Sequence, residues 1–293
     1  PRNLNNLGNG LRDRYARTGQ LADLEEAMRI YEQACLLGRE RQPEAVIVAA
    51  RSWGQWALAR QTWDEAVRAY QYGLAALEQL YQTQLLQHEQ QSWQREGQGL
   101  YARTAYALAR VGDLFAAAIA LEQGQARGLN DRLARDEANL LQVQQQAPAL
   151  FQQYQASAAR LRQLEAAERQ ERLTSPGAAT PPDWATQSGW VIHRQQVQQA
   201  RTDLQTAIAA IRRLDGYEHF LLPPRFEEVA TAVQPGHPLA YVVTTPAGSL
   251  ALLLHRPAPT AEVLIEPLWA DAFTTDNLDA FLFKEENGRE VGY

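Results

Sequence analysis

Apolar residues recur at helical spacing through the first 130 residues of the chain. Leu7, Leu11 and Tyr15, for example, follow one another at intervals of four residues. Residues at such intervals share one face of an α-helix, and an apolar face of this kind packs against a core. Apart from the first residue, the only proline in this region is Pro43. The pattern therefore predicts a series of helices over residues 1–130.

Three segments of this region share a common frame. In each, a small residue is followed by an alanine, then by a bulky residue four positions on and by a small residue three positions further. The copies are Gly8, Ala27, Tyr31 and Ala34; Gly54, Ala66, Tyr70 and Gly73; and Ala105, Ala117, Leu121 and Gly124. Small residues let antiparallel helices approach closely, and the bulky residue fills the space between neighbouring hairpins. The repetition predicts three stacked helical hairpins.

The pattern changes after residue 130. Residues 131–173 are polar and rich in glutamine but carry an apolar stripe, and a second helical pattern runs from about residue 184 to 214. The loop 174–183 between them holds three prolines and several small residues, which favours a mobile segment. Residues 131–215 are thus expected to form a long antiparallel helical pair.

Residues 216–293 have β character. The runs 239–245 and 249–255 are rich in β-branched and apolar residues and flank the turn Pro246-Ala247-Gly248, which predicts a β-hairpin. Residues 261–265 are expected to add a third strand. Because the apolar runs are nearly continuous, the pattern favours a sheet that is covered on both faces.

Charge and hydropathy exclude several classes of protein. The formal net charge is −6, with 28 Lys and Arg against 34 Asp and Glu. Proteins that bind nucleic acid usually carry a basic face, so direct binding of nucleic acid is not expected. No apolar run reaches the roughly 18 residues that a membrane-spanning helix needs, and no leader-like segment opens the chain. We therefore expect a cytoplasmic protein that does not enter a membrane.

Residues suited to catalysis or metal binding are sparse. The single cysteine, Cys35, lies in an apolar helical stretch and is expected to be a buried core residue rather than a nucleophile. None of the five histidines has a histidine or cysteine partner at a metal-ligand spacing. The glycine pairs of the chain lack the preceding strand of a phosphate-binding loop. We predict no catalytic residue, metal site or cofactor within this chain.

The first 130 residues resemble the tetratricopeptide repeat. The frame of that family, Gly or Ala followed by Ala, an aromatic residue and Ala, is matched well by the second copy. The third copy departs from it at Leu121 and Gly124, and the first copy carries an insertion. Residues 5–27 are similar to a long repeat variant that is common in bacterial multidomain proteins. The resemblance implies an α-solenoid whose groove holds a segment of a protein partner.

Seven residues are expected to line this groove, because they lie on helical faces that point away from the small-residue seam. They are Asn5, Asn9, Arg12, Arg51, Gln55, Tyr106 and Arg110. Amide side chains can bond an extended peptide backbone, and arginine can bind a carboxylate. The alternative interpretation is that each is an ordinary solvated position on a helix.

Residues 115–293 resemble the start of a CHAT domain, a caspase-like peptidase module that often follows tetratricopeptide repeats. Residues 120–129 are similar to the entry helix of that family, and residues 239–254 to its first hairpin. The resemblance implies a mainly α chain that closes with the first part of an α/β caspase-like domain. It also implies that the catalytic His and Cys follow Tyr293, so that both ends of the chain are internal to a longer protein.

The sequence thus favours the protein-binding regulatory region of a CHAT-type cysteine peptidase, inactive by itself. Two alternatives stay open. One is a non-enzymatic adaptor that binds a partner peptide or protein and whose sheet only docks or oligomerises. The other is a fragment of a repeat-containing signalling ATPase, which the lack of a Gly-x-x-x-x-Gly-Lys-Ser/Thr phosphate loop disfavours.

Overall fold

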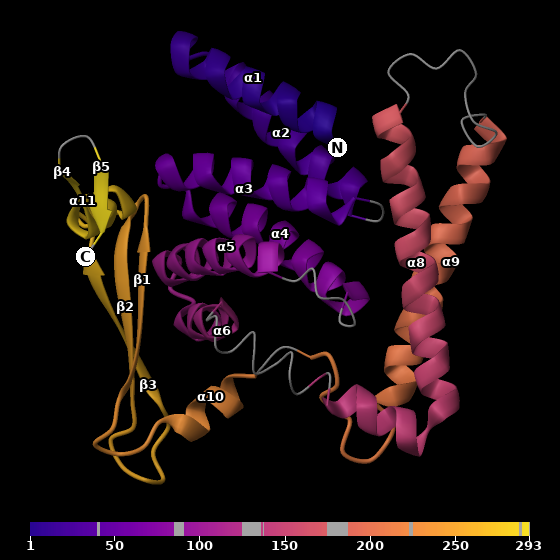
Figure 1. Cartoon of the computed structure of the whole chain (residues 1–293). Coiled ribbons are helices and arrows are strands. Elements are labelled where there is room, and N and C mark those ends of the chain that lie inside the picture. The colour runs from indigo at the N-terminus through magenta and orange to yellow at the C-terminus, as the bar shows by residue number, and fades with distance from the viewer. Residues whose placement is uncertain are drawn as a thin grey trace.

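The first part of the protein is a layered set of helices (Figure 1). The structure, a computed structural model, describes residues 1–39, 42–84, 91–124, 136, 138–174, 187–222, 225–286 and 289–292. The helices here are α1 (Arg2–Thr18), α2 (Leu21–Gly38), α3 (Pro43–Ala59), α4 (Trp63–Gln84), α5 (Gln91–Arg110) and α6 (Leu114–Gly124). α1 pairs with α2, α3 with α4 and α5 with α6, while α2 contacts α3 and α4 contacts α5. The predicted helices of this region are therefore confirmed within the described residues.

The repeated small residue works by letting an aromatic ring pack directly on a helix backbone. A Cβ atom built on Gly54 of α3 would lie 2.3 Å from Cε1 of Tyr70 on α4. A Cβ atom built on Gly8 of α1 would likewise lie 2.9 Å from Cε1 of Tyr31 on α2. Both tyrosine side chains are fully buried. The bulky residue of the frame thus packs on the glycine of its own hairpin.

A long helical pair follows the layered helices. α8 (Pro148–Thr174) and α9 (Gln187–Ile211) contact each other along their length and stand beside the end of α4 (Figure 1). Their apolar residues form a core of their own, in which Leu161, Leu204 and Ile208 are buried. The helical pair predicted from the sequence is present, whereas the predicted loop 174–183 lies, except for Thr174, outside the described residues.

A small antiparallel sheet follows the short helix α10 (Phe226–Ala232). Its strands, in the order β1-β2-β3, are β1 (Leu239–Thr245), β2 (Gly248–His255) and β3 (Leu264–Ala270). The predicted hairpin is confirmed with Val242 opposite Ala251, and the third strand begins near the end of the predicted segment. α11 (Thr275–Leu282) and the hairpin of β4 (Phe283–Glu286) and β5 (Arg289–Gly292) come last.

The prediction of a sheet covered on both faces is wrong for the described part of the chain. Burial alternates along β1, and inward residues such as Tyr241 and Leu252 join the core of the layered helices. On the other face Val242 is 74% exposed and Leu268 is 57% exposed. Successive strand residues point to opposite sides, and the inward side is the one that joins the core of the layered helices. The apolar runs therefore include residues that solvent reaches.

The contact of Gly54 with Tyr70 gives a direct test of the helix packing. We expect Gly54→Ala to lower the free energy of unfolding by about 1–3 kcal/mol, because the new methyl group overlaps the Tyr70 ring. Gly10→Ala in α1 is the control, since nothing lies within 4 Å of its added Cβ. Alanine favours the helix there by about 0.5–1 kcal/mol. Urea denaturation of the two variants should give opposite shifts, and equal shifts would refute the close approach of α3 and α4.

Candidate partner-binding site

The predicted groove residues of the first copy, Asn5, Asn9 and Arg12, all lie on α1. Asn5 is buried, and its Oδ1 atom has no hydrogen-bond partner. Asn9 accepts a hydrogen bond from the Tyr31 hydroxyl over 2.6 Å. Arg12 donates to the carboxylate of the adjacent Asp13 over 2.9 and 3.0 Å. These residues share a helix, and Asn9 and Arg12 already have partners in the chain.

The third-copy residues meet the chain's own sheet. The Tyr106 hydroxyl accepts a hydrogen bond from Arg110 over 2.8 Å and donates one to the carbonyl of Ala247 over 3.0 Å. The Arg110 guanidinium lies 3.8 Å from the centre of the Trp269 ring and forms an ion pair with Asp271. A guanidinium over an aromatic face is attracted by the ring quadrupole. Tyr106 and Arg110 therefore hold the sheet against α5.

The second copy lines a cavity beside this contact. Arg51 is half-buried, whereas Gln55 is exposed and borders a cavity of about 200 Å³. We call this the junction cavity, because α3, α4, α5 and the turn between β1 and β2 all contribute to it. Its lining residues are Gln55, Leu58, Ala59, Tyr70, Arg103, Pro246 and Ala247. The predicted groove residue Gln55 thus lies where the helices and the sheet meet.

Hydrogen-bond donors outnumber acceptors around the junction cavity. The Tyr70 hydroxyl is buried and has no hydrogen-bond partner among the residues that the structure describes. Burial raises the pKa of this hydroxyl well above its ordinary value, so it keeps its proton and can donate it to an acceptor. Arg103, whose charge acts on Tyr70, and Gln55 carry further donors, and no acidic side chain lines the cavity. The cavity is therefore suited to a side chain that bears a hydrogen-bond acceptor.

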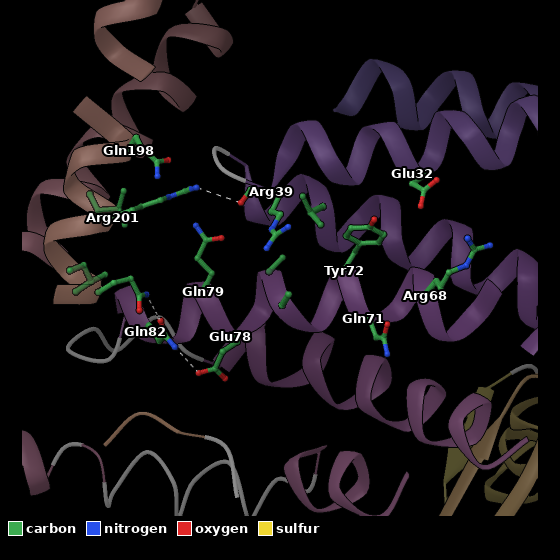
Figure 2. A pocket seen from close by; sticks show the side chains of 16 residues that line it. Glu32, Arg39, Arg68, Gln71, Tyr72, Glu78, Gln79, Gln82, Gln198 and Arg201 are labelled. Carbon is green, nitrogen blue, oxygen red and sulfur yellow. Dashed lines mark hydrogen bonds between the residues drawn. The ribbon is translucent and has the colours of Figure 1, made fainter. Parts of the chain in front are cut away.

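A second and larger cavity lies between the layered helices and the long helical pair. We call it the seam groove: it has a volume of about 690 Å³ and runs between α2 and α4 on one side and α9 on the other (Figure 2). α2 contributes Glu32 and Arg39, and α4 contributes Arg68 and Tyr72. Sequence reasoning missed these residues. Their spacing on α4 marks one helical face, but no local signal shows that α9 lies beside it.

The side chains of α9 reach across the seam groove. Arg201 donates to the carbonyl of Arg39 over 3.5 Å and to Glu165 of α8 over 3.1 Å. Gln205 donates to the Oε1 atom of Gln82 over 2.9 Å. A cation beside the last carbonyls of α2 is favoured by the helix dipole. These contacts hold the helical pair against the layered helices.

The structure also bears on the cysteine, on metal binding and on membrane-spanning helices. The Cys35 side chain is fully buried, and burial raises the pKa of its thiol to about 12. Among the residues that the structure describes, no group of three or more His, Cys, Asp or Glu is gathered as a metal site. Within the same residues, no helix combines the length and apolar character needed to cross a bilayer.

Comparisons of the chain with models of known protein families, with curated sequences and with solved structures found no match. The resemblances to the tetratricopeptide repeat and to the CHAT domain therefore stay predictions. What the chain binds has to be argued from its own residues.

The buried thiol gives a reactivity prediction. We expect Cys35 to react with a thiol reagent such as Ellman's reagent only after unfolding, because the reactive species is the thiolate and its pKa is raised to about 12. Absorbance at neutral pH, with and without urea, measures this. A peptidase assay on the chain should stay at background. Fast labelling of the folded chain, or turnover that Cys35→Ala abolishes, would contradict this prediction.

The contact between α5 and the sheet gives a second prediction for this site. We expect Arg110→Gln to lower the free energy of unfolding by about 1–3 kcal/mol, because it removes the ring contact and the ion pair. Hydrogen exchange of β3 should speed up more than that of α1. Arg29→Gln is the control, since Arg29 is exposed and pairs only with Glu26. Unchanged exchange of β3 would show that Arg110 does not hold the sheet.

Proposed function

We propose that this chain is the protein-binding regulatory region of a CHAT-type cysteine peptidase. In this proposal α1 to α6 form a tetratricopeptide-like solenoid, and one segment of a partner polypeptide lies along α3 and α5. The observation that carries the proposal is the junction cavity, lined by the donors of Gln55 and Arg103 and by Tyr70, whose buried hydroxyl has no hydrogen-bond partner among the described residues. A buried donor without a partner costs about 1–3 kcal/mol, so an acceptor from a partner is favoured there.

The walls of the junction cavity support a partner side chain with an apolar stem. Leu58, Ala59 and Pro246 supply apolar surface around the donors. A glutamate or glutamine side chain combines methylene groups with terminal acceptor atoms, and Arg103 favours the charged carboxylate. A cavity of about 200 Å³ suits one such side chain rather than a folded surface. We therefore propose that a single partner residue anchors the segment here.

The regulatory part of the proposal rests on the shared wall of this cavity. Pro246 and Ala247 belong to the turn between β1 and β2, and the Ala247 carbonyl accepts a hydrogen bond from Tyr106. A segment in the junction cavity would contact the helices and the sheet together. If the sheet can take more than one position, the partner would favour the position to which it binds most tightly. In a caspase-like module that sheet would carry the cysteine and histidine.

The catalytic step in this proposal is attack of a cysteine thiolate on a peptide carbonyl, with a histidine as the proton acceptor. Cys35 does not fit that role, because its thiol is buried within the helices and keeps its proton. The chain described here would accordingly bind and regulate without cleaving.

A non-enzymatic adaptor is the second candidate. The observation that favours it is the outer face of the sheet, where Val242, Leu264 and Leu268 are exposed. An apolar sheet face of this kind suits docking to another protein surface. The gene sequence that follows the codon for Tyr293 separates the candidates. A peptidase requires further strands, a histidine and a cysteine roughly 50 residues later, whereas an adaptor requires neither residue.

Peptide display tests the proposed binding site. Peptides selected from a random library against the chain should carry a glutamate and should lose at least tenfold in affinity with Arg103→Gln. Tyr70→Phe should weaken them as well while leaving the fold intact, because that hydroxyl has no partner in the free chain. Fluorescence polarisation measures both effects.

The control variant is Arg17→Gln, which changes an exposed arginine of α1 far along the chain from the junction cavity. It should leave the affinity of the selected peptides unchanged. Peptides that bind equally to the chain and to the Arg103 and Tyr70 variants would refute binding at the junction cavity.

A further inference from the structure

The described residues form two separate hydrophobic cores with polar contacts between them. Trp53 and Tyr70 belong to the core of the layered helices and the sheet, whereas Tyr154 and Leu204 belong to the core of the long helical pair. Polar contacts such as that of Gln205 with Gln82 cross between them. Cavities between independently packed units are common places for ligands. The seam groove lies at this boundary.

The floor of the seam groove is one face of α4. Arg68, Tyr72, Ala75 and Gln79 follow one another at intervals of three or four residues, and all line the groove. The small side chain of Ala75 leaves room above the helix. From Arg68 to Gln82 the axis of α4 rises by about 21 Å, the length of roughly six residues of extended polypeptide. The groove therefore has the dimensions of a short extended segment.

Unpaired charges gather at one end of the groove, around Tyr72 (Figure 2). Among the described residues, the guanidinium groups of Arg39 and Arg68 have no hydrogen bond or ion pair, although both act electrostatically on the Tyr72 hydroxyl. Burial and the charge of Glu32 raise the pKa of this hydroxyl, so it remains a donor. The Tyr72 ring is fixed by stacking on Trp53 with centroids 6.3 Å apart. Two guanidinium groups, one carboxylate and one hydroxyl donor thus meet at one place.

Around Tyr72 two arginines stand against the one carboxylate of Glu32, whereas the whole chain has a net charge of −6. Guanidinium groups bind carboxylates through paired hydrogen bonds, which favours an acidic side chain at Tyr72. Glu32 and Glu78 also line the groove and repel any negative charge in it. Two arginines can offset that repulsion for a single carboxylate but not for a run of phosphates, so a polyanion such as nucleic acid is disfavoured. The amides of Gln71 and Gln198 can each donate and accept, as an extended backbone requires.

We propose that the seam groove binds an extended acidic segment of a partner polypeptide. One Asp or Glu carboxylate lies over Tyr72 between Arg39 and Arg68, and the backbone runs along α4 toward α9. Because the segment touches α4 and α9 together, binding also strengthens the attachment of the helical pair. This surface shares no residue with the junction cavity, so the proposal stands or falls separately from the proposed function.

The probe is a capped, fluorescein-labelled heptapeptide of alternating threonine and alanine with a central glutamate. We expect it to bind the chain at least tenfold more tightly than the matched peptide with a central glutamine, as measured by fluorescence anisotropy. Arg68→Gln and Arg39→Gln should each remove most of this difference. Tyr72→Phe should weaken binding severalfold, because the ring stays stacked on Trp53 and only the donor is lost.

Two controls locate the effect. Arg29→Gln removes an arginine of α2 that does not line the groove and pairs with Glu26 instead, so it should leave the affinity unchanged. Arg103→Gln, in the junction cavity, should also have no effect. Circular dichroism of each variant checks that it is folded.

Three results would overturn the proposal. The first is equal affinity for the glutamate and glutamine peptides, including no binding of either peptide at about 1 mM, the weak limit of specific binding. The second is a glutamate preference that survives both arginine changes. The third is tighter, Arg68-dependent binding of a labelled single-stranded oligonucleotide, which would assign the groove to a polyanion.

Discussion

The absence of a side chain at Gly54 is the constraint on which the repeat packing and the junction cavity both depend. Because no Cβ atom stands on α3 at this point, the Tyr70 ring lies directly against its backbone. Beyond this contact Tyr70 lines the junction cavity together with Gln55 and Leu58 of α3. The close approach of Tyr70 to Gly54 therefore buries an aromatic side chain whose hydroxyl has no partner among the described residues. The same residue serves the core and the candidate site.

The sheet depends on a second contact of this kind, at Arg110. Its guanidinium is near the rings of Trp63, Tyr106 and Trp269, and it pairs with Asp271. Arginine suits this place because its planar group can stack on rings and bond a carboxylate at once. The contact joins α5 to strand β3, which lies about 160 residues later in the chain. The sheet is thus held by this polar contact together with inward residues such as Tyr241 and Leu252, which join the core of the layered helices.

Local patterns predicted the helices, the hairpin and the seam glycines, because each depends on neighbours within one or two turns. Counting helical faces also placed Gln55 on a surface that borders a cavity. The same counting could not show that the chain's own sheet meets Tyr106, or that Asn9 bonds Tyr31, since both contacts depend on how elements pack. The seam groove was missed for the same reason. Its walls come from α2 and α9, and the contact of Arg201 with the Arg39 carbonyl spans 162 residues.

Hydrogen-bond donors line both cavities, and α4 contributes to each, with Tyr70 in the junction cavity and Arg68 and Tyr72 in the seam groove. Arg103 and Tyr70 on one side, and Arg39, Arg68 and Tyr72 on the other, carry protons that the described residues do not accept. Exposed cations lose little by remaining hydrated, so the seam groove alone gains only a moderate advantage from an acidic partner. The Tyr70 hydroxyl is buried and has no acceptor among the described residues, which costs more than leaving an exposed cation unpaired, so it is the stronger physical reason to expect a ligand.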